Sequence, residues 1–313
     1  MLGILEVFTL IFSVIGVGYV LARTKIIASD AQRLVFNKVA FFAATPALIF
    51  QVVATSQPAA LISPMILTST CAALLTAALY VACSRIWFPA NWGTTVMGAA
   101  SSGYVNSNTI GLPVGIYVLG NIAYMPPLLL MQITILTPII LGLITRPSKA
   151  SRIRQIFAIV RQSLFTPIVL AAFAGFIVSL GQFEIPDLLL NPIELLGGAS
   201  IPMVLISFGA SLYSSQASHT WALDRATVTV ICLKTFVMPA LAFVIGFLIG
   251  LDSQQLYAVA ILATLPTAHN VYNYAATYQQ GVEIARDSVL ITTFLALPAM
   301  LGIAGIAHLA QAF

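Results

Sequence analysis

The sequence predicts an all-α polytopic membrane protein with ten transmembrane helices in two inverted five-helix repeats. Composition is the first reason: 60% of the 313 residues are hydrophobic and 7% are charged, against about 25% charged residues in soluble domains. The second reason is a series of apolar runs of about 20 residues, each long enough to cross a hydrocarbon core about 30 Å thick. We predict spans at 4–22, 34–54, 62–83, 93–119, 122–145, 163–181, 191–213, 226–250, 254–279 and 288–309.

The distribution of charge is the third reason, and it orients the spans. Lys and Arg follow odd-numbered spans, whereas the connections after even-numbered spans carry only acids, at Glu184, Asp187 and Asp252. Cytoplasmic loops are enriched in Lys and Arg, so we expect the odd-numbered connections in the cytoplasm and both termini outside. The basic 146–161 loop is then cytoplasmic, in a linker (146–162) between repeats 1–145 and 163–313. Topology and membrane lipid explain the net charge of +4, so no nucleic-acid partner is expected.

No cleaved leader, metal or cofactor is expected. Span 1 carries Glu6 before its apolar stretch and its cations afterwards, which is typical of a retained first span. The cysteines, Cys71, Cys83 and Cys232, lie in or at the edge of spans without CxxC spacing. Neither disulfides nor a metal site are therefore predicted.

Proline and asparagine residues that recur at similar offsets support the division into halves. An odd number of spans in each half requires the second half to be inverted relative to the first. Three residue pairs recur at offsets of 156, 160 and 162, namely Pro46 with Pro202, Pro138 with Pro298, and Asn108 with Asn270. Inverted repeats in transporters usually place the substrate site near the bilayer midplane, at the repeat interface.

Spans 4 and 9 are both interrupted by polar residues, Pro or Gly, at 104–113 and 265–274. Backbone groups freed by such interruptions are tolerated in hydrocarbon only where they line a cavity. Paired interruptions in the two halves therefore indicate a substrate site. The candidate site residues are Tyr104, Ser107, Asn108, Thr109, Gly111, Pro113, Lys234, Pro266, Thr267, His269 and Asn270.

Asn108 and Asn270 lead this set, because an uncharged amide can bind a carboxylate or an alkali cation. Helix N-termini at the breaks would add unpaired N–H groups and partial positive charge, which suits an anion. The alternative is that these amides only tie the broken segments together. The same two interpretations stay open for Ser107, Thr109 and Thr267, and for the neighbouring Asn106.

Two titratable residues have two interpretations each. Lys234 lies about nine residues, or roughly 12 Å, inside span 8. It either attracts a substrate carboxylate or neutralises helix carbonyl ends, or its long stem snorkels to the cytoplasm. Lys38 lies about one turn into span 2, where snorkelling is favoured. His269 either couples transport to protons or serves as a neutral hydrogen-bonding group.

The scarcity of acids narrows the function. Apart from Glu6 and Glu194 near outer ends, the predicted spans contain no carboxylate, so a cation/proton antiporter is disfavoured. Coupling to H⁺ or Na⁺ would have to use amides, hydroxyls, carbonyls or His269. A membrane-embedded enzyme would need a nucleophile–base set, a metal cluster or paired acids, and none is present. A channel-like or receptor protein on the same fold remains an alternative.

Several motifs together resemble the auxin efflux carrier family over essentially the whole chain. They are Gly197–Pro202 through Phe208–Leu212, Leu265–Asn270 with Tyr278, Ser107–Thr109 with Gly111 and Pro113, Asn37-Lys38 before Pro46, and Lys234 before Pro239. The family belongs to the bile-acid/auxin transporter superfamily and includes plant PIN-type auxin exporters and bacterial malate and malonate carriers. The short basic loop of this chain is like that of bacterial members, which implies a prokaryotic inner membrane.

The resemblance implies a fold similar to bile-acid symporters and NhaA. Spans 1, 2, 6 and 7 would form a scaffold, and spans 3–5 and 8–10 a transport unit in which broken helices 4 and 9 cross at the site. It implies a secondary active transporter or uniporter for small organic anions, working by alternating access. Malate- or malonate-class acids are the first expectation and auxin-like acids the second. A homodimer through the scaffold helices is also expected.

Overall fold

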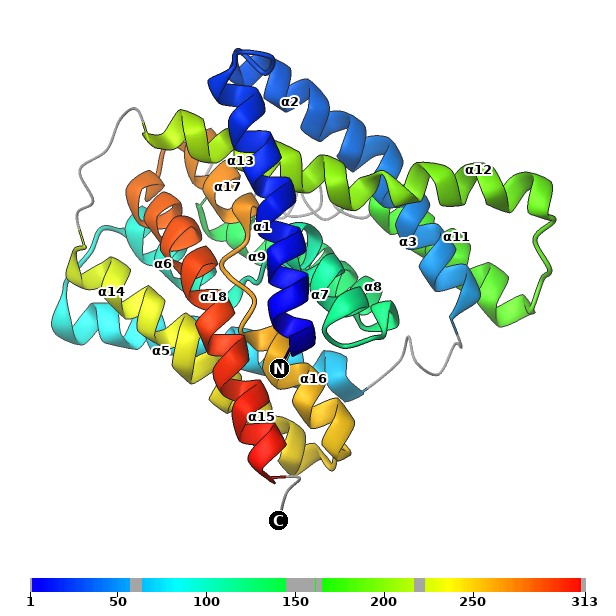
Figure 1. Cartoon of the computed structure of the whole chain (residues 1–313). Helices are drawn as coiled ribbons and strands as arrows, with labels where there is room; N and C mark the ends of the chain where they lie inside the picture. Colours follow the sequence, from blue (N-terminus) through cyan, green and yellow to red (C-terminus); the bar gives the residue numbers. More distant parts are fainter. Residues whose placement is uncertain (1, 57–63, 145–160, 162–164, 217–222, 311–313) are drawn as a thin grey trace.

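The computed structural model describes residues 2–56, 64–144, 161, 165–216 and 223–310, and their regular elements are helices (Figure 1). Most of the linker at 146–162 lies outside these ranges. In the first half the helices are α1 (Leu2–Arg23), α2 (Asp30–Val39), α3 (Thr45–Thr55), α5 (Pro64–Trp87), α6 (Trp92–Gly103), α7 (Leu112–Tyr117), α8 (Met125–Met131) and α9 (Thr137–Ile144). In the second half they are α11 (Pro167–Gly181), α12 (Asp187–Gly198), α13 (Ser200–Gln216), α14 (Arg225–Cys232), α15 (Met238–Ile249), α16 (Ser253–Ala263), α17 (His269–Tyr278) and α18 (Val282–Ala310).

Within the described residues, six helical segments are long and apolar enough to cross a membrane. They are Ala31–Thr55, Pro64–Trp87, Ile122–Ile144, Asp187–Tyr213, Arg225–Ile249 and Val282–His308. Two shorter apolar helices, Thr9–Arg23 and Pro167–Gly181, coincide with predicted spans 1 and 6. Predicted spans 4 and 9 are each divided into two shorter helical pieces, separated by residues 104–106 and 264–268.

Prolines explain why several of these segments change their helical winding. Wider π-helical turns occur at η1 (Ala40–Ala44), η2 (Ser107–Gly111), η4 (Gln132–Leu136) and η5 (Leu233–Val237). Each of these turns ends two residues before a proline, at Pro46, Pro113, Pro138 and Pro239 respectively. Proline has no N–H to donate and its ring clashes with the carbonyl four residues earlier, so the preceding turn widens by one residue. Such π turns are frequent at functional sites.

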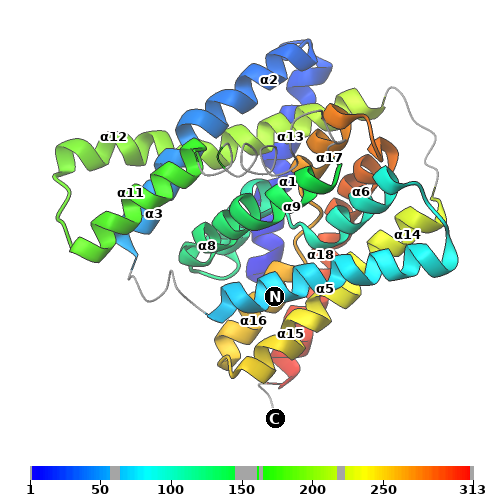
Figure 2. The ribbon, with the colours of Figure 1, turned by 180° about the vertical axis from the view of Figure 1, so that it is seen from behind.

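Helices of the first half pack against helices of the second half. The helix of predicted span 1 (α1) packs along α13, in span 7, and that of span 6 (α11) packs along α3, in span 2 (Figures 1 and 2). Both contacts are close: an added Cβ on Gly209 would lie 1.9 Å from the Ile15 carbonyl oxygen, and one on Gly175 would lie 2.8 Å from that of Phe50. Where the pairs meet, the Thr45 and Ser200 hydroxyls are hydrogen-bonded at 2.8 Å.

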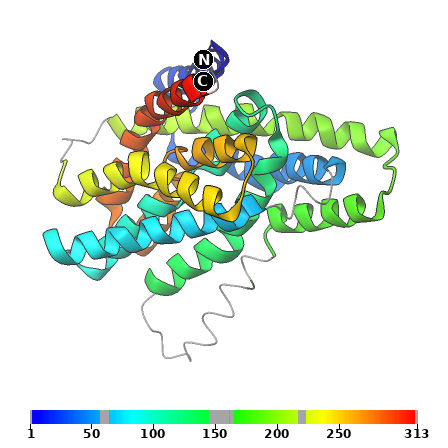
Figure 3. The same cartoon turned by 90° about the horizontal axis from the view of Figure 1, so that it is seen from below.

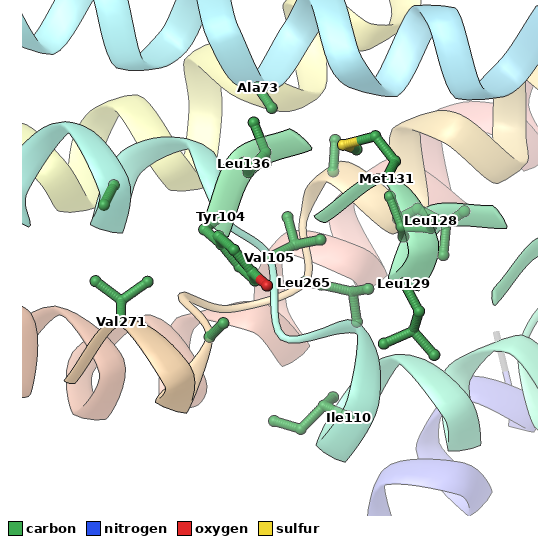
Figure 4. Close-up of a cluster of buried hydrophobic side chains, with 14 of the residues drawn as sticks. Ala73, Tyr104, Val105, Ile110, Leu128, Leu129, Met131, Leu136, Leu265 and Val271 are labelled. Atoms are coloured by element: carbon green, nitrogen blue, oxygen red, sulfur yellow. The ribbon is translucent and has the colours of Figure 1, made fainter. Parts of the chain in front are cut away.

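The remaining helices form a second group. Helix α5 packs on α6 and α15, α15 packs on α16, and α18 packs on α6 and α14. Viewed from below, α3, α11 and α12 extend to one side of the molecule, whereas α5 and α14 lie on the other (Figure 3). The largest buried apolar cluster surrounds the two interruptions, with Tyr104, Val105 and Leu265 near its centre (Figure 4).

One expectation about charge is wrong. Helix α18 begins at Val282, six residues before the predicted start of span 10, so Glu283 and Asp287 belong to it. Asp287 is only 6% exposed, and its Oδ1 accepts a hydrogen bond from Arg286 Nε at 2.7 Å. The neighbouring guanidinium compensates the charge of this buried carboxylate. The long apolar helices therefore do contain a buried acid.

Candidate functional site

The two interruptions pair with each other. Val105 and Thr267 form an isolated antiparallel bridge. Asn106 N–H donates to the Pro266 carbonyl at 2.7 Å, and Ala268 N–H donates to the Tyr104 carbonyl at 3.0 Å. We call the two segments, 104–106 and 264–268, the crossover; they lie side by side at the centre of Figure 4. Their pairing satisfies backbone groups that have no water partner in an apolar interior.

The residues of these two hydrogen bonds are related by an offset of 162, the same offset that relates Asn108 to Asn270. Adding 162 to Asn106 and Tyr104 gives Ala268 and Pro266, so each bond maps onto the other. Asn270 likewise follows Asn108 by 162 residues. The two halves therefore contribute backbone positions to the crossover that are related by a single sequence offset.

Side chains from two further helical segments support the crossover at matching positions. Gln132, in η4, donates from Nε2 to the Val105 carbonyl at 2.9 Å and accepts a hydrogen bond from the Ser107 hydroxyl. Thr292, 160 residues later in α18, accepts the Thr267 N–H at 2.9 Å. The Thr267 hydroxyl donates to the Ser101 carbonyl at 2.7 Å. Sequence reasoning missed Gln132 and Thr292, although a glutamine six residues before Pro138 in an apolar span was a usable signal.

The candidate amides lie on the helices that follow the crossover. Asn108 is half-buried in η2, and its Oδ1 has no partner among the described residues. Asn106 is 3% exposed; its Oδ1 caps the helix by accepting the Thr109 N–H at 3.0 Å, and its Nδ2 has no partner there. Unpartnered buried polar atoms are rare in folded proteins, because each costs about 1–3 kcal/mol.

The start of α17 carries the matching group from the second half. Asn270 is half-buried, and its side chain interacts with the Tyr104 hydroxyl. His269 Nδ1 is buried without a partner in the described structure. The His269 ring packs edge-on against Phe208 of α13, with 6.2 Å between ring centroids, and against Tyr272. The first turn of α17 has no side-chain cap, and its Val271 N–H donates to the Ala268 carbonyl at 3.0 Å. The N–H groups of His269 and Asn270 stay available to an anion.

Tyr104 is 2% exposed and lies among polar side chains. Its hydroxyl is hydrogen-bonded to Thr137 Oγ1 at 3.1 Å, and Thr137 Oγ1 to the Tyr274 hydroxyl at 3.2 Å. Together with its Asn270 contact, this network makes Tyr104 a support for the amide rather than an open wall of a cavity.

Gly111 and Pro113 shape the first break. Gly111 N–H donates to the Asn106 carbonyl at 2.9 Å. A Cβ at Gly111 would lie 3.1 Å from Leu265 Cδ1, so a larger residue would press on the other crossover segment. Pro113, in the first turn of α7, needs no N–H partner there.

Lys234 points into the protein, so the snorkelling interpretation is wrong. The residue is 1% exposed, and Nζ lies 3.1 Å from the Ala263 carbonyl oxygen and 3.0 Å from Met238 Sδ. Ala263 is the last residue of α16, where the helix dipole is negative and a cation is favourable. Lys234 thus lies on the carbonyl side of the crossover, and its hydrogen-bond partners do not include Asn108 or Asn270. Lys38 lies in the last turn of α2, close to the position expected from the sequence.

Among the described residues, no group of three or more His, Cys, Asp or Glu side chains could hold a metal ion. The arrangement as a whole offers uncharged donors and acceptors on one side of the crossover and a buried ammonium group on the other.

Comparison with known proteins gives a family and a relative. A protein family described as "Membrane transport protein" matches residues 4–304. A protein of Rhizobium meliloti (strain 1021) named "Putative malonate transporter" is 25% identical over 300 residues, covering 93% of this chain and 92% of the relative. The similarity thus extends over the crossover and both halves.

Proposed function

This chain belongs to the auxin efflux carrier family of membrane transport proteins, and we propose that it is a secondary active transporter or uniporter for small organic anions. It would work by alternating access in a prokaryotic inner membrane, with both termini outside. Malonate- or malate-class dicarboxylates are the first substrates to test, since the relative from Rhizobium meliloti is named for malonate. Auxin-like aromatic acids are the second.

The proposed architecture is ten spans in two inverted five-helix repeats. Two helix pairs support it: α1 packs along α13, and α11 packs along α3. In each pair the first span of one half contacts the second span of the other half, as expected for two repeats of the same design. In this arrangement α1, α2, α3 and α11–α13 belong to the scaffold. The helices from α5 to α9 and from α14 to α18 form the transport unit, which carries the crossover.

One observation carries the site proposal: three buried polar atoms without partners in the described structure lie close to the ends of the two crossover segments. They are Asn106 Nδ2, Asn108 Oδ1 and His269 Nδ1. Amides present either N–H or oxygen by rotation about the last side-chain bond, so both asparagines can donate to a carboxylate. The uncapped first turn of α17 adds backbone N–H groups and partial positive charge. A carboxylate bound here would satisfy groups that are otherwise unpartnered.

Lys234 has a separate role in this proposal. Its Nζ donates to the carbonyl end of α16, and in its protonated form it would give the crossover a positive charge. No carboxylate is paired with it in the described structure, so its field extends to an incoming anion, and a low-dielectric interior screens this attraction weakly.

Counterflow in proteoliposomes tests the proposal. Liposomes loaded with unlabelled malonate should accumulate labelled malonate transiently and saturably, and other organic acids should compete according to their affinity. A channel would equilibrate the label without overshoot. If neither malonate, malate nor indole-3-acetate gives counterflow or competes, the proposed substrate class is wrong.

A further inference from the structure

Two serines beside the crossover differ from their neighbours. Ser101 in α6 and Ser288 in α18 are both 0% exposed, and neither hydroxyl has a partner among the described residues. Serine and threonine hydroxyls inside helices usually bond back to a carbonyl one turn earlier. Ser102, Thr292 and Thr293 do so, at 2.9, 2.6 and 2.6 Å. The lone pairs of Ser101 and Ser288 therefore remain available to a ligand.

Thr267 brings these two serines into one neighbourhood. Its hydroxyl donates to the carbonyl of Ser101, and its N–H donates to Thr292 Oγ1. The Thr292 hydroxyl in turn donates to the carbonyl of Ser288. A single crossover residue thus connects the turn of α6 that holds Ser101 to the turn of α18 that holds Ser288.

The electrostatics at this place favour a cation. Ser101 lies in the last turn of α6, at the negative end of its dipole. The carbonyls of Ser102 and Gly103, which end this helix, accept no hydrogen bond from the described residues. The equivalent end of α16 carries the Lys234 ammonium on Ala263. No basic side chain in the described structure donates to the last turn of α6.

The charged groups nearest in sequence are compensated. Asp287 precedes Ser288 and is paired with Arg286 at 2.7 Å, so this pair adds little net charge. The other groups that bond to Thr267 are neutral hydroxyls and carbonyls. Hydroxyls and helix-terminal carbonyls are suited to Na⁺, and broken transporter helices coordinate Na⁺ through such carbonyls.

We infer that Ser101 and Ser288 form a binding site for a dehydrated monovalent cation, with Na⁺ as the first candidate, at the carbonyl end of α6. The cation takes the place that Lys234 has at the end of α16. Cation binding would fix the position of Thr267 and, three residues later, of Asn270. The consequence of this cation site for the coupling of transport rests on the proposed function, whereas the existence of the site does not.

Thermal unfolding of the purified protein in detergent, followed by intrinsic tryptophan fluorescence, tests the site without any organic acid. NaCl is titrated against choline chloride at constant ionic strength, with KCl and LiCl as further arms. We expect Na⁺ to raise the melting temperature saturably. In Ser101→Ala and Ser288→Ala the half-saturating Na⁺ concentration should rise about tenfold or more, since losing one ligand of about 1.4 kcal/mol changes an affinity tenfold. Ser102→Ala, which removes a buried hydroxyl already bonded to Gly98, should keep the wild-type midpoint.

The outcomes distinguish a bound cation from a general salt effect and from a buried water molecule. If the wild type responds equally to Na⁺ and choline, or if both alanine variants keep its Na⁺ response, there is no such site. If the variants lose stability by the same amount in both salts, the hydroxyls hold a buried water, which also overturns the inference. Ser288→Cys, which keeps the volume but offers a poor ligand, replaces Ser288→Ala if the latter does not fold.

The same titration with malonate distinguishes this inference from the proposed function. A Na⁺ response without stabilisation by any organic acid would contradict the anion carrier and leave the cation site standing. Stabilisation by malonate without a specific Na⁺ response would contradict the cation site and leave the anion carrier standing.

Discussion

The carbonyl ends of α6 and α16 meet at the same crossover, yet they are stabilised by different chemistry. At the end of α16, Lys234 donates to the Ala263 carbonyl. At the end of α6, the Ser101 carbonyl accepts a hydrogen bond from the neutral Thr267 hydroxyl, and the carbonyls of Ser102 and Gly103 have no partner among the described residues. Backbone hydrogen bonds at the crossover are nevertheless related by one offset. The backbone hydrogen bonds of the two crossover segments are thus alike, whereas single side chains make the two helix ends chemically unequal.

The largest expected effect on transport comes from Asn108 and Asn270, because each half of the chain contributes one of these two amides. Asn108→Ala and Asn270→Ala should each lower organic-anion uptake about 10- to 150-fold, because a hydrogen bond to a charged group contributes about 1.5–3 kcal/mol. Initial uptake rates in proteoliposomes measure this, with monodispersity in size-exclusion chromatography as the folding control. Unchanged transport in both variants would contradict the site. A loss in only one would show that the amides, too, are unequal.

Lys234→Met should separate function from stability. Burying an ammonium group costs several kcal/mol, and one hydrogen bond to a carbonyl with the dipole interaction returns about 2–4 kcal/mol. We therefore expect an unchanged or higher melting temperature together with about tenfold lower uptake, equivalent to about 1.4 kcal/mol. If the variant unfolds more easily but transports normally, the lysine serves the structure alone, and the contrast between the helix ends has no functional meaning.

Gln132→Leu and Thr292→Val compare the supports of the two crossover segments. Gln132 makes two hydrogen bonds to the first segment and the residue after it, whereas Thr292 makes one to the second segment. Hydrogen bonds between membrane helices contribute about 0.6–2 kcal/mol each. Gln132→Leu should thus destabilise the protein by about 1–3 kcal/mol and Thr292→Val by about 1 kcal/mol, as measured by thermal unfolding. Equal losses would show that the supports are equivalent after all.

The smallest effect is expected for Lys38→Gln, the matched control for Lys234. Lys38 lies in the last turn of α2, well away in sequence from either crossover segment, and substitutions outside such sites usually change stability by less than about 0.5 kcal/mol. Melting temperature and uptake should both stay near wild type. A loss of uptake as large as that of Lys234→Met would mean that charge anywhere on the protein matters, rather than charge at the crossover.

Sequence reasoning located the interruptions because Pro, Gly and polar side chains cannot continue an apolar helix without consequence. Asn108, Asn270 and Pro266 indicated the breaks in this way, and the shared offset indicated that the breaks are related. The prediction failed at Asp287, because the start of a helix is hard to place when a neighbouring Arg compensates the acid. It also left Gln132 unnoticed: a glutamine in an apolar span is a signal of a polar role, but the sequence alone does not say toward which residues its side chain points.

The amino-acid sequence was sufficient to identify a helical membrane protein with paired breaks at matching places, since composition and local backbone chemistry act within a few residues of the chain. The folded structure was needed to establish that the two breaks bond to each other, that Lys234 turns inward to Ala263, and that the Ser101 and Ser288 hydroxyls stay unpartnered beside Thr267 among the described residues. These features depend on contacts between residues far apart in the chain, and the direction of a side chain at such a contact is set by what packs against it.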